Sequence, residues 1–241
     1  MTDPIFYQGE NTPALGYAKE ALAGWGLVFS ATADSRVTHV LLGAPTNISA
    51  LPKGLGQVTV IGGRLRGLEG LEQVDILTDG DYLAENADIT AHCAVKAALQ
   101  RLPVTLKGLP VLVVGWGRIG KCLGQLLRSM GAAVTIAARK ASDRAILAAL
   151  GYETLDTAAL GYELVRFRLI FNTADAMVLP RQALEYCRAD CLKIDLASTA
   201  GMEGPDVLWL RGLPGKEAPE TSGQLIAKTV LRCLRQKGDL L

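Results

Sequence analysis

The feature that most constrains the fold is the run VLVVGWGRIGKCLGQLLRSMGAAVTIAARK at residues 111–140. Gly115, Gly117 and Gly120 form a G-x-G-x-x-G pattern directly after a short apolar run and directly before a helical segment, about 119–130. A second apolar run, 134–138, follows the helical segment. A strand, a glycine turn, a helix and a second strand in this order are typical of a dinucleotide-binding unit.

Each glycine of this turn has a physical purpose. The first permits a tight turn, the second lets the backbone approach a pyrophosphate, and the third lets the helix pack closely on the strand. The start of the helix adds free N–H groups and the positive end of its dipole, which favour phosphate. A tight turn without a ligand is the alternative, but strand, helix and strand in register favour nucleotide binding. The predicted cofactor-binding residues here are Gly115, Gly117, Arg118, Ile119 and Gly120.

The end of the second strand carries cations where a carboxylate would hold an NAD ribose. Arg139 and Lys140 follow the apolar run. A carboxylate at this place would repel a 2′-phosphate, whereas a guanidinium can bind one with two hydrogen bonds. The two residues could instead form a solvated basic loop. Together with the glycine pattern they favour NADP over NAD.

Apolar runs alternate with helical patterns along the rest of the chain. We expect strands at 5–8, 27–30, 39–45 and 58–63 and, beyond the glycine turn, at 169–173, 191–197 and 206–210. Helices are expected at 13–26, 88–102, 142–150 and 219–238, with Asp88 or Thr90 capping the second of these. This alternation predicts an α/β fold with a doubly wound parallel (Rossmann) sheet and a second, smaller α/β N-terminal lobe. The expected divisions are an N-terminal lobe at 1–85, an interlobe helix at 86–103, an NADP-binding domain at 104–217, and a C-terminal helix at 218–241 that returns toward the interlobe region.

Composition narrows the class of ligand. Lys and Arg total 25 against 24 for Asp and Glu, so the net charge of +1 gives no reason to expect nucleic acid or an acidic membrane as partner. Five scattered cysteines and two histidines indicate neither a structural metal site nor a disulfide framework. No run of 18 apolar residues and no secretory leader pattern is present, which predicts a cytoplasmic protein with a small-molecule role.

Polar residues follow the later strands at the edge where open α/β sheets bind ligands. Asn172 and Thr173 follow one apolar run, Asp195 ends the next, and Ser198 and Thr199 come after it. We interpret Asn172, Thr173 and Asp195 as further cofactor-binding residues. Their alternative roles are to cap the segments that follow or to satisfy buried backbone donors.

Several stretches together resemble the A subunits of dipicolinate synthase, two-lobed relatives of the 2-hydroxyacid dehydrogenases. They are the glycine turn with its flanks, FNTADAMVL, LKIDLASTAG and GLPGKEAPETSGQLIAKTV, within residues 85–235. The resemblance implies an NADP-dependent oxidation that forms pyridine-2,6-dicarboxylate (dipicolinate) from the cyclic condensation product of aspartate semialdehyde and pyruvate. It further implies a role in sporulation and, for the partner, a flavoprotein-like B subunit.

That reaction suggests roles for particular residues. A small dicarboxylate substrate calls for cations or hydroxyl groups, and the candidates are Lys216, Ser198, Arg118 and Thr199. His92, on the expected interlobe helix, is the candidate general base, although it could equally be a partly buried helix residue. Lys216, Ser198 and His92 therefore form the predicted catalytic set. A homodimer is a reasonable expectation for this build.

Two other functions stay open. One is another two-lobed dehydrogenase of 2-hydroxy or 2-amino acids, but the nucleotide-binding half contains no histidine to serve it. The other is a non-catalytic NADP-binding sensor or partner subunit, which would fit the unusual residues at 173–175 and 199–202. Cofactor binding without turnover would favour the second.

Overall fold

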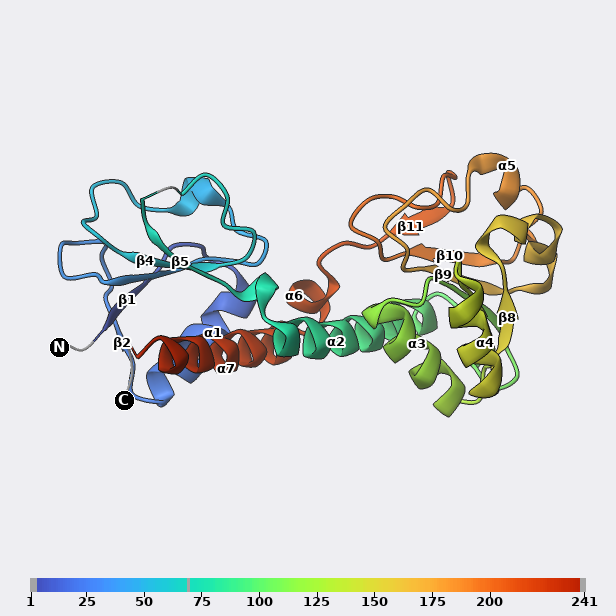
Figure 1. The fold of residues 1–241 in the computed structure, drawn as a ribbon, viewed down its shortest axis with the longest axis horizontal. Coiled ribbons are helices and arrows are strands. Elements are labelled where there is room, and N and C mark those ends of the chain that lie inside the picture. Colours follow the sequence, from blue (N-terminus) through green and yellow to red (C-terminus); the bar gives the residue numbers. More distant parts are fainter. Residues whose placement is uncertain (1–3, 69, 239–241) are drawn as a thin grey trace. The chain divides into compact units, whose positions relative to one another are not determined.

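The chain forms two compact units in a computed structural model that describes residues 4–68 and 70–238. The first unit consists of Met1–Ile89 and Pro214–Leu241, and the second of Thr90–Leu213. Helix α2 (Gly80–Leu99) runs from the first unit into the second (Figure 1). The chain thus enters the second unit and returns to the first at its C-terminal helix.

The first unit contains a five-stranded parallel sheet in the order β2-β1-β3-β4-β5. Its strands are β1 (Ile5–Gln8), β2 (Val28–Phe29), β3 (His39–Leu41), β4 (Thr59–Gly62) and β5 (Glu72–Asp75), with short 3-10 helices η1 (Ile48–Ala50) and η2 (Ile76–Thr78). Helices α1 (Pro13–Gly24) and α7 (Pro219–Lys237) lie together on one face of this sheet (Figure 1). Their apolar sides share a core with Phe6, Leu41 and Ile61. A second core of Val40, Val60 and neighbouring loop residues lies apart from it.

Strand β5 was not predicted, because only Val74 of its four residues is buried. Its sequence, EQVD, has no apolar run to indicate a strand. It forms by pairing with β4, with Val74 opposite Ile61. Tertiary pairing therefore decides the structure of this segment where local propensity does not.

The start of helix α2 corrects a prediction. The helix begins at Gly80 and ends at Leu99, so neither Asp88 nor Thr90 caps it. Asp79 does so instead, because its side chain accepts a hydrogen bond of 2.7 Å from the Tyr82 backbone N–H.

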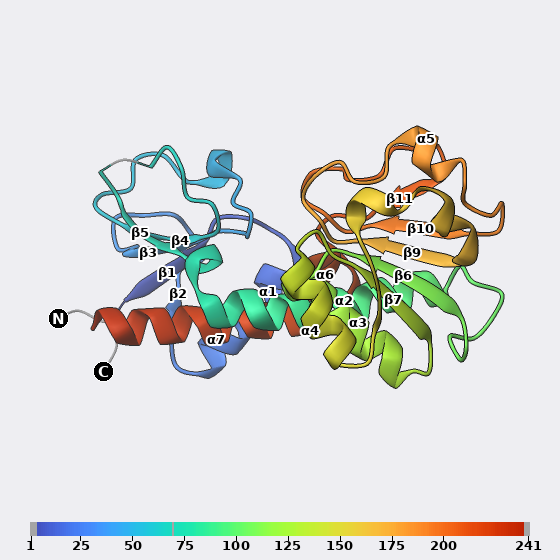
Figure 2. The same ribbon diagram turned by 45° about the vertical axis from the view of Figure 1, so that its right-hand side comes forward.

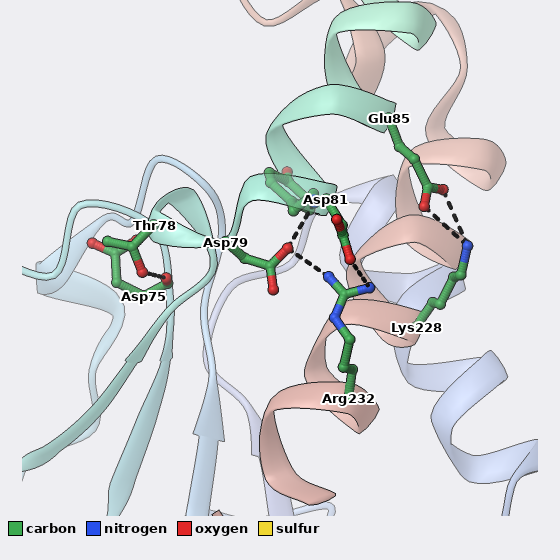
Figure 3. A network of polar contacts seen from close by, with 8 residues as sticks. Asp75, Thr78, Asp79, Asp81, Glu85, Lys228 and Arg232 are labelled. Carbon is green, nitrogen blue, oxygen red and sulfur yellow. Dashed lines mark hydrogen bonds and ion pairs between the residues drawn. The ribbon is translucent and has the colours of Figure 1, made fainter. Parts of the chain in front are cut away.

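Ion pairs with α7 hold the first turns of α2 (Figure 3). Arg232 binds Asp79 and lies 3.4 Å from Asp81. Lys228 binds Glu85 at 3.0 Å. The charged residues of these first turns have their partners far along the chain. Such partners leave no local signal in the sequence, so the start of α2 could not be predicted from its own residues.

The second unit contains a six-stranded parallel sheet in the order β11-β10-β9-β6-β7-β8 (Figure 2). The strands are β6 (Pro110–Val114), β7 (Ala133–Ala137), β8 (Glu153–Leu155), β9 (Leu169–Asn172), β10 (Leu192–Asp195) and β11 (Val207–Trp209). The connections include α3 (Arg118–Ser129), α4 (Ala141–Ala149), η3 (Thr157–Ala159), η4 (Gly161–Arg166) and α5 (Arg181–Leu184), and α6 (Leu213–Glu217) follows β11. The prediction of a doubly wound Rossmann sheet with a second α/β unit is confirmed.

The strand order reverses between β6 and β9, and such a switch point is where open α/β sheets bind ligands. The ends of β6, β7, β9 and β10 all lie at one edge, because the strands are parallel and in register. No helix in the described part of the chain is long and apolar enough to cross a membrane.

Candidate functional site

The turn between β6 and α3 is built around two crowded glycines. Gly115 has a φ of 103°, a conformation that side-chain-bearing residues rarely adopt. A Cβ at Gly120 would lie 2.2 Å from the carbonyl oxygen of Gly115, so the helix could not approach the turn so closely. A Cβ at Gly117 would meet nothing within 4 Å. The first and third glycines are needed for packing, and the second leaves open space beside the backbone.

The N-terminus of α3 is left without a side-chain cap. Gly117 is the N-cap residue and no side chain accepts a hydrogen bond from the first turn. The first backbone N–H groups of a helix have no acceptor within it. Arg118 and Gly117 are exposed, and Ile119 is half-buried. Open donors, a positive dipole end and the space at Gly117 fit the pyrophosphate of a dinucleotide.

Thr173 closes the turn from the β9 side. Its backbone N–H and its hydroxyl both donate to the carbonyl of Val114, at 2.8 and 3.0 Å. The hydroxyl oxygen lies 2.6 Å from the place of a Cβ at Gly115 and 3.1 Å from that at Gly120. Thr173 was predicted to contact the cofactor, and the structure places its side chain against the glycine turn.

The loop after β7 presents two exposed cations, Arg139 and Lys140, as the sequence indicates. A third cation, Arg144 on α4, holds this loop in place. Its guanidinium donates to the carbonyls of Ala138 and Arg139, each at 2.8 Å, and pairs with Asp156 at 2.9 Å. Arg144 was not predicted from the sequence, since a basic residue within a helix carries no sign of which carbonyls it binds.

A buried polar pair lies where the ends of β9 and β10 meet. Asn172 and Asp195 are both 0% exposed, and the Asn172 amide donates to Asp195 at 2.9 Å. Asp195 also accepts from the backbone N–H groups of Ala197, Gly201 and Met202, at 3.0, 2.7 and 3.0 Å. A buried carboxylate with four donors is stabilised by them and forms a rigid anchor for the loop.

The burial of Asn172 and Asp195 gives no support to their prediction as cofactor-binding residues. Neither side chain has surface that a ligand could touch, and the Asn172 oxygen accepts from Ala174 N at 3.1 Å. Their alternative role, satisfying buried backbone donors, is the one that the structure supports. They shape the loop from which Ser198 projects.

Gly201 is a further residue of this edge that was not predicted from the sequence. A Cβ there would lie 2.4 Å from the amide nitrogen of Asn172 and 2.6 Å from the carbonyl oxygen of Ala176. Ser198 and Thr199 are exposed between this glycine and β10. The backbone N–H of Thr199 donates to Asp175 at 2.7 Å, which joins the two loops across the edge of the sheet. The glycine in S-T-A-G was the available signal for such a close approach.

The other two members of the predicted catalytic set, His92 and Lys216, differ in their positions, since His92 belongs to the second unit with Ser198 and Lys216 belongs to the first. His92 shares a groove with Leu126 and Met130, at the C-terminal half of α3. Leu126 is eight residues beyond Arg118, or about 12 Å along the helix axis. Within this unit His92 is therefore not at the ligand-binding edge, and the structure gives no support to its role as a base. Lys216 is exposed on α6 and belongs to the first unit.

Comparisons with known proteins agree with this geometry. No protein-family model matches the sequence. Over 171 residues the chain is 28% identical to the dipicolinate synthase A subunit of Bacillus subtilis (strain 168), and the match covers 68% of this chain and 58% of that protein. The resemblance noted from the motifs is thereby confirmed, although the aligned region is little more than half of the relative's length.

Solved structures share the fold over nearly the whole chain. The dipicolinate synthase A subunit of Bacillus halodurans superposes with a TM-score of 0.80 at 20% identity, covering 97% of this chain and 98% of that one. A transhydrogenase from Sinorhizobium meliloti superposes with a TM-score of 0.74 at 15% identity, covering 98% and 94%. At these identities the likeness establishes the fold of two α/β units.

Proposed function

We propose that the chain is an NADP-dependent oxidoreductase that forms pyridine-2,6-dicarboxylate, like the A subunit of a dipicolinate synthase. The observation that carries the proposal is the uncapped N-terminus of α3 behind the glycine turn, next to a loop of cations. It supports a dinucleotide with an additional phosphate. The sequence likeness to the Bacillus subtilis protein supports the reaction.

The preference for NADP rests on charge at the end of β7. Arg139 and Lys140 are exposed there, and the first acid beyond them is Asp143, within the first turn of α4. A guanidinium and an ammonium group at this place attract a 2′-phosphate, and no carboxylate at the strand end is available to hold a 2′-hydroxyl. Arg144 binds the carbonyls of Ala138 and Arg139, which holds the backbone of the loop that carries the exposed Arg139.

The reaction needs a hydride acceptor and a positioned substrate. The cyclic substrate loses water, then one hydride to the nicotinamide and one proton to solvent or a base, which leaves the aromatic ring. When bound, the cofactor supplies the hydride acceptor, and the protein supplies orientation and electrostatics. Ser198 presents an exposed hydroxyl at the sheet edge and is proposed to position the substrate, while the role of Lys216 stays a prediction from the resemblance. The proposed partner is a flavoprotein-like B subunit, because the relative is itself one lettered component of a synthase.

Cofactor choice is tested by titrating NADP and NAD against the wild-type protein and Arg139→Asp. We expect NADP affinity to fall about 100-fold in the variant and NAD affinity to change less than about threefold, because the acid repels only the 2′-phosphate. Lys107→Asp is the matched control, since Lys107 is exposed and precedes β6 at the opposite edge of the sheet. Equal losses for both cofactors in Arg139→Asp would contradict the assignment.

The reaction is tested by following ultraviolet absorbance of pyridine-2,6-dicarboxylate. The substrate is the fresh condensation product of aspartate semialdehyde and pyruvate, supplied with NADP, with and without a flavoprotein-like partner. We expect product with NADP and a strong loss of rate in Ser198→Ala at unchanged NADP affinity. Intact NADP binding without product under either condition would indicate a cofactor-binding sensor protein instead.

A further inference from the structure

An exposed tryptophan lies at the ligand-binding edge of the second unit. Trp209 ends β11, pairs with Asp195 in the sheet register, and is 45% exposed. Its indole N–H donates to the carbonyl of Ala197 at 2.9 Å. Ala197 in turn is held by Asp195, through a hydrogen bond of 3.0 Å. The buried anchor described above therefore fixes the orientation of a large aromatic ring at the surface.

The ring supports a guanidinium. The central carbon of Arg211 lies 5.3 Å from the centre of the Trp209 ring, within the range of a cation–π contact. A guanidinium over an aromatic face keeps the N–H groups of its edge available for hydrogen bonds. Arg211 is exposed, and among residues 4–68 and 70–238 no carboxylate forms an ion pair with it.

Arg211 is also isolated in charge at this part of the edge. The segments that follow β9, β10 and β11 are 173–180, 196–206 and 210–212, and they contain one Lys or Arg between them, which is Arg211. The remaining charged residues there are the acids Asp175, Glu203 and Asp206, and Asp206 pairs with Lys193. The cations near the glycine turn lie on the β6 and β7 side and are accounted for by phosphates.

We propose that Arg211, oriented by Trp209, is a subsite for one carboxylate of a planar cyclic dicarboxylate. The inference rests on the proposed function, which it deepens by naming a group that selects a dicarboxylate over a monocarboxylate. A guanidinium fork and a carboxylate form two parallel hydrogen bonds, and the fork is already oriented before the substrate arrives. Ser198 follows Ala197, whose carbonyl accepts the hydrogen bond from Trp209. The Ser198 hydroxyl and the Arg211 guanidinium therefore lie on two segments that this hydrogen bond joins.

The experiment measures binding of pyridine-2,6-dicarboxylate and of pyridine-2-carboxylate to the full chain in the presence of NADP. In Arg211→Ala we expect the affinity for the dicarboxylate to fall about 30-fold and that for the monocarboxylate to change much less. Arg211→Lys should recover part of the loss, because it restores the charge without the fork. Affinity for NADP should stay within about twofold, because Arg211 lies on the far side of β10 and β9 from the glycine turn.

Arg188→Ala is the matched control. Arg188 is half-exposed, pairs with Asp190 and precedes β10. The substitution therefore removes a guanidinium at the opposite edge of the same sheet. It should change neither affinity. Trp209→Leu should weaken dicarboxylate binding less than Arg211→Ala does, since it removes the support and leaves the charge.

The outcomes separate this inference from the function it rests on. A wild-type protein that forms the product, together with an Arg211→Ala variant that binds both pyridine carboxylates as the wild type does, would overturn the inference alone. A wild-type protein that binds NADP but neither pyridine carboxylate, and forms no product, would overturn the proposed function and the subsite with it. An equal loss for the dicarboxylate and the monocarboxylate would also reject Arg211 as the selective group.

Discussion

The two units begin with the same local topology but differ at the start of the first helix. In the first unit β1 leads to α1 and then to the parallel strand β2, and in the second β6 leads to α3 and then to the parallel strand β7. Thr12 caps α1, accepting from the Leu15 N–H at 3.3 Å, and Pro13 contributes no N–H at all. Helix α3 has Gly117 at the same place and no side-chain cap. A side chain thus satisfies one donor at the N-terminus of α1, whereas the N-terminus of α3 has no side-chain cap.

The glycines of the two helices show the same difference in packing. A Cβ at Gly16 in α1 would meet nothing within 4 Å, whereas a Cβ at Gly120 in α3 would lie 2.2 Å from the Gly115 oxygen. Of these two helices, α3 is therefore the one whose first turn packs closely on the turn before it. The proposed dinucleotide site of the second unit therefore depends on an uncapped helix and a crowded turn, and not on topology alone.

The largest effect is expected from Gly120→Ala. The added methyl group must displace the backbone of Gly115, and we expect a loss of about 2–3 kcal/mol in the free energy of unfolding together with loss of measurable NADP binding. Gly16→Ala is the matched control in the first unit, where the methyl group has room and alanine favours the helix. Chemical denaturation and NADP titration measure both. Equal changes in the free energy of unfolding in the two variants would contradict the packing difference between α1 and α3.

A second large effect is expected from Gly117→Asp, which gives α3 the kind of side-chain cap that α1 has. In Gly117→Asp the side chain can accept from the first turn of α3 and places a negative charge where the pyrophosphate is proposed to bind. We expect NADP affinity to fall about 100-fold, with stability unchanged or slightly increased. Gly117→Ala, which adds a methyl group in open space, is the control and should fold normally. Undiminished NADP binding to Gly117→Asp would place the cofactor away from this helix.

These differences mark what the sequence could and could not predict. The glycine turn was predictable because each glycine obeys a local rule, and Arg139 because it directly follows a strand. Asn172 and Asp195 were placed at the correct edge, but a sequence does not tell whether a polar side chain there points outward or is buried with four donors. Helix α2 begins early because Asp79 caps it and Arg232 binds that cap, and strand β5 exists because β4 pairs with it. Such long-range partners decide what local patterns leave open.

A smaller effect is expected from Arg144→Ala, which loosens the basic loop without removing Arg139 or Lys140. Because Arg144 holds two loop carbonyls at 2.8 Å, its loss should widen the range of positions that Arg139 occupies. We expect NADP affinity to fall about fivefold and NAD affinity to change little, because Arg144 is proposed to act on the 2′-phosphate only through the position of Arg139. Arg144→Lys keeps the charge but not the fork, so it should resemble Arg144→Ala if position matters and the wild type if only charge does. Titration of both cofactors distinguishes these cases. An equal loss of affinity for NADP and NAD would indicate a general change in the structure of the second unit instead.

The smallest effect concerns the first turn of α2, which lies in the first unit and is capped by Asp79. The hydrogen bond from Arg232 holds the pKa of Asp79 below its usual value of 3.8, although partial burial opposes this. Since the folded-state pKa is lowered, the stabilisation is fully present above the unfolded-state pKa and is lost as the pH falls through the folded-state pKa.

Asp79→Asn keeps the cap and removes the charge, so it should lower the free energy of unfolding by about 0.5–1 kcal/mol at pH 7 and by progressively less below about pH 4. Asp81→Asn is the control, because Asp81 is 76% exposed and lies 3.4 Å from the same guanidinium. Urea unfolding at a series of pH values measures the difference. If the loss of unfolding free energy in Asp79→Asn persisted unchanged into strong acid, the cap geometry, and not the ion pair with Arg232, would hold the first turn of α2.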